Sequence, residues 1–567
     1  MKSVKSNRYH DLDALRAFAM LLGIFLHGLL SFFPNPIWPG QDIYQHKSYE
    51  TLLHIIHGFR MPLFFLVSGF FTAMMWRKRG LGGLFKHRIN RIFVPMIVFG
   101  IIVIPLNFGI GAWGNSKKLT NNKKAISTIE SDLKYSKSII PFKTLDELKK
   151  NNLLFVKQAF RDGMSPNSKD NAGVPILNWA ASYNYSGIVE LILDSGGDPD
   201  ICDNKKTTAL MMTGIFGADE TSEILIKRGA NINLKNEDGS DALIMTSLDW
   251  GIISFLGNMM QIPLDKNKII EGRLKVAEKL KNNGANPQNR NFLVGFIGNQ
   301  NSPEWVKRLF SIIGGVWFLS VIPVFHHLWF LYYLLWLVVG FILVTWMNRK
   351  LNFKKIPDIW LKAPFSFLWL VPLTFVFQSM MFMSFGPDTN IGIIPWPPTL
   401  LYYGVFFGFG AVCFNRDVFE KKYDKSWPIF WILSIPIFML ALHFFDTRNN
   451  SFGMDWVKSH ITYAFFTVIY TWLLIFGFIG IFSKLFSIEN SKIRYLSDSS
   501  YWLYIMHLPL IQSLQIIVSQ WNIPSYVKLF GTCAITILLL LLIYELVVRY
   551  TWLGAILNGR KYRMTIN

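Results

Sequence analysis

Ten apolar runs recur along the 567-residue chain, and each is long enough, or nearly so, to cross a bilayer. A helix of about 20 apolar residues spans the roughly 30 Å of hydrocarbon. Apolar residues make up 51% of the chain and charged residues only 16%, below the level of about 25% usual in soluble proteins. The runs lie near residues 13–33, 54–76, 92–112, 327–347, 364–385, 399–414, 427–445, 460–483, 500–518 and 529–549. They predict an all-α fold, a polytopic membrane helix bundle of about ten spans.

Lysine and arginine are distributed unevenly between the segments that connect these runs. Six segments, which include 77–91 and both ends of the chain, carry 23 Lys and Arg residues, whereas the four alternate short loops carry 4. Positive residues favour the cytoplasmic side, so both termini of this integral membrane protein are predicted to be cytoplasmic. Basic residues in cytoplasmic loops then explain much of the net charge of +21, and we do not expect nucleic acid as a partner.

The first run, residues 11–33, keeps Arg16 and His27 among apolar residues. Their spacing of eleven residues is three helical turns plus about 20°, so the two side chains share one face, roughly 16 Å apart along the axis. A snorkelling arginine and a packing histidine would explain the pair without chemistry. Ionisable groups at membrane depth are costly, however, and usually face an interior site or a water-filled cavity. We therefore predict a functional site on this face.

Other polar residues lie within the second run or directly before the third. Arg60 is suited either to hold an anionic group or carbonyl oxygen, or to snorkel at the end of its span, and both readings stay open. Ser68 is predicted to be a helix-packing residue, since small residues let membrane helices approach closely. Arg88 and Arg91 lie one turn apart at the start of the third run, where they could grip phosphates entering from the cytoplasm.

Between the third and fourth runs, residues 115–301 lack long apolar stretches and contain a repeat. The segments RDGMSPNSKDNAG, SGGDPDICDNKKT and RGANINLKNEDGS align on Gly163, Gly197 and Gly229, spaced 34 and 32 residues apart. This period resembles that of ankyrin repeats, about 33 residues. We expect an inserted helical ankyrin-repeat solenoid with room for about four repeats. Such a solenoid either offers a concave face to a protein partner or serves as a spacer, and both remain open.

The predicted organisation has three parts. Residues 1–114 form the first part of a membrane domain with spans one to three, 115–301 form the insert, and 302–567 form the second part with spans four to ten. Three spans precede the insert, so parity predicts that it lies outside the cytoplasm. Its own charges do not test this placement, because loops longer than about 60 residues escape the positive-inside rule.

Six motifs, in order along the chain, resemble one family. They are RYHDLDALRAFAMLLGIFLH, MPLFFLVSGFF, RINRIFVP, HLWFL, SYWLYIMHLP and YTWLGAILNGRK. Together they resemble the acyltransferase-3 family of bacterial membrane acyltransferases, and more narrowly the branch called glucan biosynthesis protein C. The resemblance covers about 1–112 and 305–560. The ankyrin-like insert departs from the family pattern, which leaves the acceptor and its access route open.

The resemblance implies an enzyme that moves an acetyl or succinyl group from cytoplasmic acyl-CoA to a carbohydrate hydroxyl of a cell-envelope glycan. It also implies a place in a bacterial inner or plasma membrane, with membrane lipid around the bundle. The acyl-CoA is a donor substrate, and neither a permanently bound cofactor nor a metal is expected. The residues that the motifs imply are His27 as catalytic base with Arg16 as its partner, Arg60 as a further catalytic residue, Arg88 and Arg91 for the donor, and His327, Trp329, Tyr501 and His507 for substrate binding.

Two other classes of protein compete with this interpretation. A proton-coupled transporter also uses buried histidine and arginine. A channel or receptor with an ankyrin binding domain is disfavoured, because the runs contain no voltage-sensor pattern of arginines and no evident selectivity-filter sequence. Formation of an acylated product separates an acyltransferase from a transporter, which moves its substrate unchanged.

Overall fold

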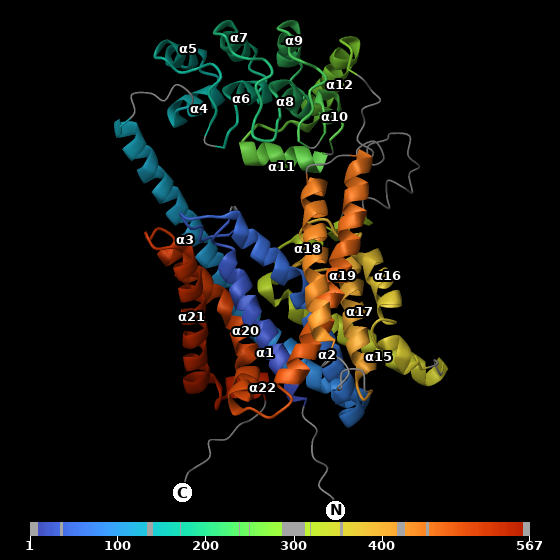
Figure 1. Cartoon of the computed structure of the whole chain (residues 1–567). Coiled ribbons are helices and arrows are strands. Elements are labelled where there is room, and N and C mark those ends of the chain that lie inside the picture. Colours follow the sequence, from blue (N-terminus) through green and yellow to red (C-terminus); the bar gives the residue numbers. More distant parts are fainter. Residues whose placement is uncertain are drawn as a thin grey trace, which may run out of the picture. The chain divides into compact units, whose positions relative to one another are not determined.

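The fold was analysed in a computed structural model of the chain (Figure 1). The residues that it describes are 9–33, 38–132, 140–170, 172–237, 239–248, 250–285, 312–313, 315–317, 319–351, 355–416, 426–449 and 453–558. They form helices and two isolated β-bridges, and no strand occurs among them. The expected all-α fold is therefore confirmed. The chain divides into two compact units, one of residues 1–120, 313–446 and 459–567, and one of residues 121–312 and 447–458.

The first unit contains the helices that are long and apolar enough to cross a membrane. Seven such stretches occur in the described residues: His10–Leu29, Lys47–Lys117, His326–Leu351, Trp427–Asn449, Met454–Leu485, Ser491–Val518 and Ser525–Val548. The second stretch covers two of the expected spans. Two further expected spans appear as the shorter apolar helices α16 (Phe367–Gln378) and α17 (Pro397–Cys413). The protein therefore has the helices of a polytopic membrane bundle.

The helix α1 (His10–Leu29) lies inside this bundle. It packs against α2 (Lys47–Arg88), α20 (Ser491–Val518) and α21 (Ser525–Ile543), and Figure 1 shows α1, α20 and α21 running side by side. Twelve of the twenty residues of α1 are buried, which explains why its polar side chains meet protein on more than one face. The residues on α1 are thus held by three neighbouring helices.

The continuous stretch 47–117 reverses direction at a glycine. Gly80 interrupts α2 with φ of +69° and ψ of 179°, a conformation that glycine adopts at little cost. The Arg88 guanidinium donates a hydrogen bond to the hydroxyl of Thr72 at 2.7 Å. A straight helix would separate residues sixteen positions apart by roughly 24 Å. The chain therefore folds back here, before the short π-helix η1 (Ile89–Phe93) leads into α3 (Val94–Asp132).

Two glycines allow α2 and α17 to pack backbone against backbone. A Cβ added at Gly69 would overlap the carbonyl oxygen of Phe407, and a Cβ added at Gly410 would overlap the carbonyl oxygen of Leu66. The contact is thus reciprocal, and it is the small-residue packing that membrane helices use to approach closely. Because α2 also carries His57 and Arg60, this contact fixes the helix that presents them.

The second unit is built from short helix pairs. These are α4 (Phe142–Lys149) with α5 (Leu153–Arg161), α6 (Ile176–Ser182) with α7 (Ser186–Asp194), α8 (Ala209–Phe216) with α9 (Asp219–Lys227), and α10 (Ala242–Met245) with α12 (Lys266–Asn282). In the last pair, α11 (Trp250–Met260) is inserted in the sequence between the two helices. Successive pairs stack and bury one apolar core. This is the repeat architecture that the sequence period predicted.

The repeat register differs from the predicted one at the middle glycine. The helix pairs end in left-handed glycines at Gly163, Gly196 and Gly229, so the predicted Gly197 is wrong and the period is 33 residues, from 163 to 196 and from 196 to 229. The next glycine of this kind that ends a helix pair is Gly284, after α12 and 55 residues further on. The inserted helix α11 and the greater length of α12 account for this displacement.

We expect Gly69→Ala and Gly410→Ala each to destabilise the membrane unit by about 1–3 kcal/mol, the usual cost of inserting atoms into a packed contact. The measurement is thermal unfolding of the detergent-solubilised chain. Gly408→Ala is the matched control on α17, because a Cβ there meets nothing within 4 Å. Equal unfolding temperatures for all three variants would contradict the close contact.

Candidate active site

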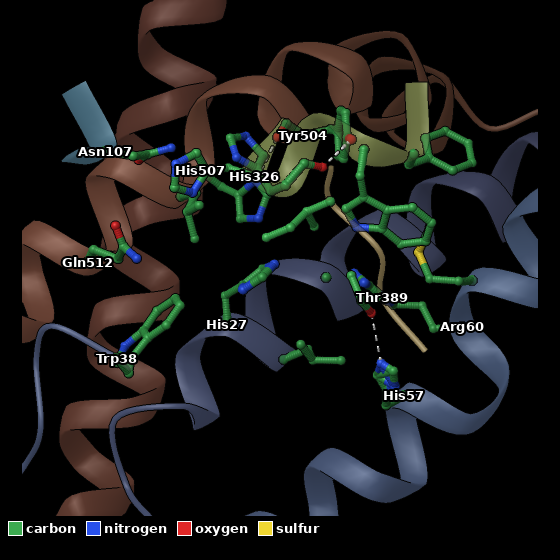
Figure 2. Close-up of a pocket in the computed structure, with 18 of the residues that line it drawn as sticks. His27, Trp38, His57, Arg60, Asn107, His326, Thr389, Tyr504, His507 and Gln512 are labelled. Atoms are coloured by element: carbon green, nitrogen blue, oxygen red, sulfur yellow. Dashed lines mark hydrogen bonds between the residues drawn. The ribbon is translucent and has the colours of Figure 1, made fainter. Parts of the chain in front are cut away.

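A cavity of about 540 Å³ opens inside the membrane unit (Figure 2). Residues of α1, α2, α3, α20 and the start of α15 (Trp329–Leu351) line it, together with His326 and His327 from the short helix η3 (His326–Leu328). The lining contains five histidines and one arginine but no carboxylate. Such a gathering of ionisable side chains within an apolar bundle indicates a functional site.

His27 projects from the last turn of α1 into this cavity (Figure 2). Its ring stacks on that of Trp38 at 5.9 Å between centroids and 12° between planes, and it lies 5.1 Å from the ring of His507 on α20. Its Nδ1 is buried and has no hydrogen-bond partner in the described part of the chain. The imidazole is thus held by ring contacts, with its polar atoms left for a ligand.

The side-chain amide of Gln515 on α20 forms hydrogen bonds with Trp38 and with the backbone of α1 at His27 and Gly28. Its Oε1 accepts a hydrogen bond from the indole nitrogen of Trp38 at 2.9 Å, and its Nε2 donates to the carbonyl oxygen of Gly28 at 2.8 Å and, more weakly, to that of His27 at 3.3 Å. Gln515 is fully buried. It therefore links the backbone end of α1 to the aromatic ring that covers the His27 imidazole.

Arg60 on α2 places its guanidinium against Gly23, one helical turn before His27. A Cβ added at Gly23 would overlap Nη1 of Arg60, so glycine makes the space for this charge. Among the described residues, no hydrogen bond or ion pair engages Arg60, and its Nε is buried without a partner. An unpaired cation in an apolar cavity is suited to bind an anion or developing negative charge.

Two further histidines have their tautomers set by backbone carbonyls, which only accept hydrogen bonds. His327 donates from Nε2 to the carbonyl oxygen of Ile505 at 2.9 Å, and His507 donates from Nδ1 to that of Tyr504 at 2.8 Å. In a neutral imidazole the second nitrogen is then an acceptor. Those nitrogens, Nδ1 of His327 and Nε2 of His507, are buried, and no described residue forms a hydrogen bond with them. Trp329 completes this wall of the cavity.

The remaining predicted residues lie outside the cavity. Arg16 donates to the hydroxyl of Ser497 at 2.7 Å and lies 3.4 Å from the Asp13 carboxylate, so it faces α20 as His27 does, three turns away. Arg88 is held by Thr72 and lies near the Arg16 guanidinium and the Tyr501 phenol. The structure thus brings together His27, Arg60, His327, Trp329 and His507 but places Arg16, Arg88, Arg91 and Tyr501 elsewhere.

Arg91 belongs to a second, basic pocket of about 600 Å³ in the same unit. Its guanidinium donates to the carbonyl oxygens of Ala555 at 2.7 Å and Ile556 at 3.1 Å, near the end of α22 (Trp552–Asn558), where a cation satisfies free helix carbonyls. Arg79, Lys86 and His87 also line the pocket, and no carboxylate does. This composition is typical of a site for phosphate groups.

Several cavity residues were not predicted from the sequence. They are Trp38, His57, Asn107, His326, Thr389 and Gln512. Asn107 carried a usable signal, since it is a polar residue in the middle of the third apolar run. Trp38 carried no comparable signal, and its place in the site is evident only from its contact with the His27 ring. The described residues contain no group of three or more His, Cys, Asp or Glu side chains arranged to hold a metal.

Comparison with known protein families matches residues 9–147 and 291–545 to the family described as "Acyltransferase domain". The chain belongs to this acyltransferase family. Residues 148–256 match the family of ankyrin repeats in three copies, which confirms the nature of the insert.

Curated relatives include "Glucans biosynthesis protein C" of Escherichia coli (strain K12), 35% identical over 98 residues, and the protein of the same name from Salmonella paratyphi B, 34% identical over 97 residues. Each match covers 17% of this chain and 25% of the relative. The chain thus matches about a quarter of the length of these relatives.

Gly23→Ala tests whether the position of Arg60 matters for turnover by this acyltransferase family member. The added methyl group must push aside the end of a flexible side chain, so we expect a small effect on unfolding temperature but about a hundredfold loss of turnover, as for a misplaced catalytic group. Gly109→Ala on α3 is the control, because a Cβ there meets nothing within 4 Å. Unchanged turnover in Gly23→Ala would separate Arg60 from the chemistry.

Proposed function

We propose that this protein is an integral membrane O-acyltransferase that moves an acetyl or succinyl group from acyl-CoA to a carbohydrate hydroxyl of a cell-envelope glycan. The observation that carries the proposal is the cavity in which His27 and the unpaired Arg60 meet, inside a domain of the acyltransferase family. The name of the curated relatives, "Glucans biosynthesis protein C", supports a glucan as the acceptor class.

In the proposed reaction, neutral His27 accepts the proton of the sugar hydroxyl while that oxygen attacks the thioester carbonyl. The carbonyl oxygen becomes an oxyanion, and the guanidinium of Arg60 stabilises it. Collapse of this intermediate breaks the carbon–sulfur bond, and the proton held by His27 passes to the departing thiolate. The products are an O-acyl ester and free CoA, and His27 returns to its neutral form.

The donor is proposed to place its phosphates in the basic pocket of Arg79, Lys86 and Arg91. Val94 of that pocket and Asn107 of the cavity both lie on α3, thirteen residues apart, which is roughly 20 Å along a helix. The thioester arm would cross this distance past Arg16, Arg88 and Tyr501. In this proposal, Arg88 and Arg16 are cations that lie along the route of the donor between the basic pocket and the cavity.

The proposed topology places the basic pocket at the cytoplasmic face, where acyl-CoA is available, and both termini on the same side. The acceptor glycan then reaches His27 from the opposite face of the membrane. The ankyrin-repeat insert is proposed to be extracytoplasmic, where it offers a surface to a protein partner.

His27→Ala tests the function and its central residue together. Membranes that carry the full chain receive labelled acetyl-CoA or succinyl-CoA on the cytoplasmic side, and label is followed into the glycan fraction. We expect transfer by the wild type and a loss of about 10²–10⁴-fold in His27→Ala, the usual contribution of a general base. His443→Ala is the matched control, since His443 is exposed on α18 (Trp427–Asn449) and lies outside the cavity.

Equal incorporation by wild type and His27→Ala would remove His27 from the chemistry. The protein is a transporter instead if neither donor yields labelled product and the chain moves an acylated sugar across the membrane without changing it.

A further inference from the structure

The side chain of Asn107 is buried in the wall of the cavity and is unused by the protein. Only 5% of Asn107 is exposed, and neither its Oδ1 nor its Nδ2 has a hydrogen-bond partner among the residues that the structure describes. Buried amides are nearly always hydrogen-bonded, because an unpaired buried donor or acceptor costs the full desolvation penalty. Asn107 lies at membrane depth on α3, so packing among apolar helices does not account for it. Its amide therefore points to a polar ligand in the cavity.

Two more unpartnered atoms face the same cavity from α20. Oε1 of Gln512 is buried without a partner, and Nε2 of His507 is an acceptor because Nδ1 donates to the Tyr504 carbonyl. Figure 2 shows Asn107, His507 and Gln512 on the α20 side of the cavity, with Trp38 beyond Gln512. The wall thus presents an acceptor on each of three side chains, and the amide groups of Asn107 and Gln512 also supply donors.

This arrangement selects for hydroxyl groups. Acceptor atoms need hydrogen-bond donors, and a hydroxyl donates one hydrogen while accepting from a donor such as the Asn107 amide. A cationic ligand would require a carboxylate, and none lines the cavity. The cation of Arg60 projects from α2, a different element from those that carry Asn107 and Gln512. The chemistry of this wall therefore matches a neutral ligand rich in hydroxyl groups.

We propose that Asn107 and Gln512, together with His507, form the subsite that binds the hydroxyl groups of the acceptor sugar. This inference rests on the proposed function, and it assigns a binding role to two residues that the sequence motifs do not mark. The indole of Trp38 supplies a flat apolar surface beside His27, against which the C–H face of a sugar ring can pack. The reacting hydroxyl would then lie between this wall and the His27 imidazole.

The polar arm of the donor also contains amides and a hydroxyl, so the experiment must separate the acceptor from the donor. The variants are Asn107→Leu and Gln512→Leu in the full chain, which keep size and remove the polar atoms. Maltotriose is the acceptor probe and acetyl-CoA the donor. We expect the KM for maltotriose to rise about tenfold or more in each variant, consistent with one lost hydrogen bond, while the KM for acetyl-CoA changes less than twofold.

Thr532→Val is the matched control. It removes a buried hydroxyl on α21 that bonds only backbone within its own helix and lies outside the cavity. If a leucine variant does not fold, Asn107→Asp and Gln512→Glu replace it, because these keep the shape and one acceptor but lose the amide donor. A change in both KM values, or in the KM for acetyl-CoA alone, overturns the assignment and places the donor arm on this wall.

A binding measurement in the absence of acetyl-CoA tests the subsite separately from the proposed acyltransferase function. Calorimetry should detect maltotriose binding to the wild type, and about tenfold weaker binding to Asn107→Leu. If wild type and variant transfer acetyl groups with the same KM for maltotriose, the subsite is wrong and the acyltransferase function stands. If maltotriose binds only when Asn107 and Gln512 are intact but no transfer occurs, the subsite stands and the proposed function fails. If the wild type does not bind maltotriose, the subsite is overturned.

Discussion

The unpaired guanidinium of Arg60 is the constraint on which the site depends. A cation inside an apolar bundle is costly, and here no carboxylate among the described residues offsets that cost. The fold accommodates it by geometry, since Gly23 removes the side chain that would occupy its place. The packing of Gly69 against Phe407 and of Gly410 against Leu66 holds α2 close to α17 and so fixes the helix that carries Arg60. The protein thus keeps a positive charge available one turn from His27.

The polar side chains of the membrane unit form two groups with different chemistry. The cavity combines Arg60 with neutral hydrogen-bonding groups, whereas the basic pocket gathers Arg79, Lys86 and Arg91 without a carboxylate. Arg16 and Arg88 lie outside the cavity, held by hydroxyls of α20 and α2. This division suits a donor whose phosphates and thioester are far apart, and an acceptor that is uncharged. Two elements, α2 and α3, contribute to both sites.

Much of the fold could be predicted from the sequence, because long apolar runs and a 33-residue period are local signals. The shared face of Arg16 and His27 followed from helical geometry, and both residues do face α20. The glycine register was harder, since DSGG offers two adjacent glycines and only the backbone conformation identifies Gly196. The role of Gln515 was out of reach, because it depends on contacts with residues almost 500 positions earlier in the chain.

The central claim is that the acyl group is transferred in the cavity between His27 and Arg60, from a donor anchored in the basic pocket. An experimental structure of the full chain with a non-reactive thioether analogue of acetyl-CoA tests it most directly. The account predicts density for the acyl end beside His27 and for the phosphates beside Arg79 and Lys86. An analogue bound with its acyl end outside the cavity would contradict the account.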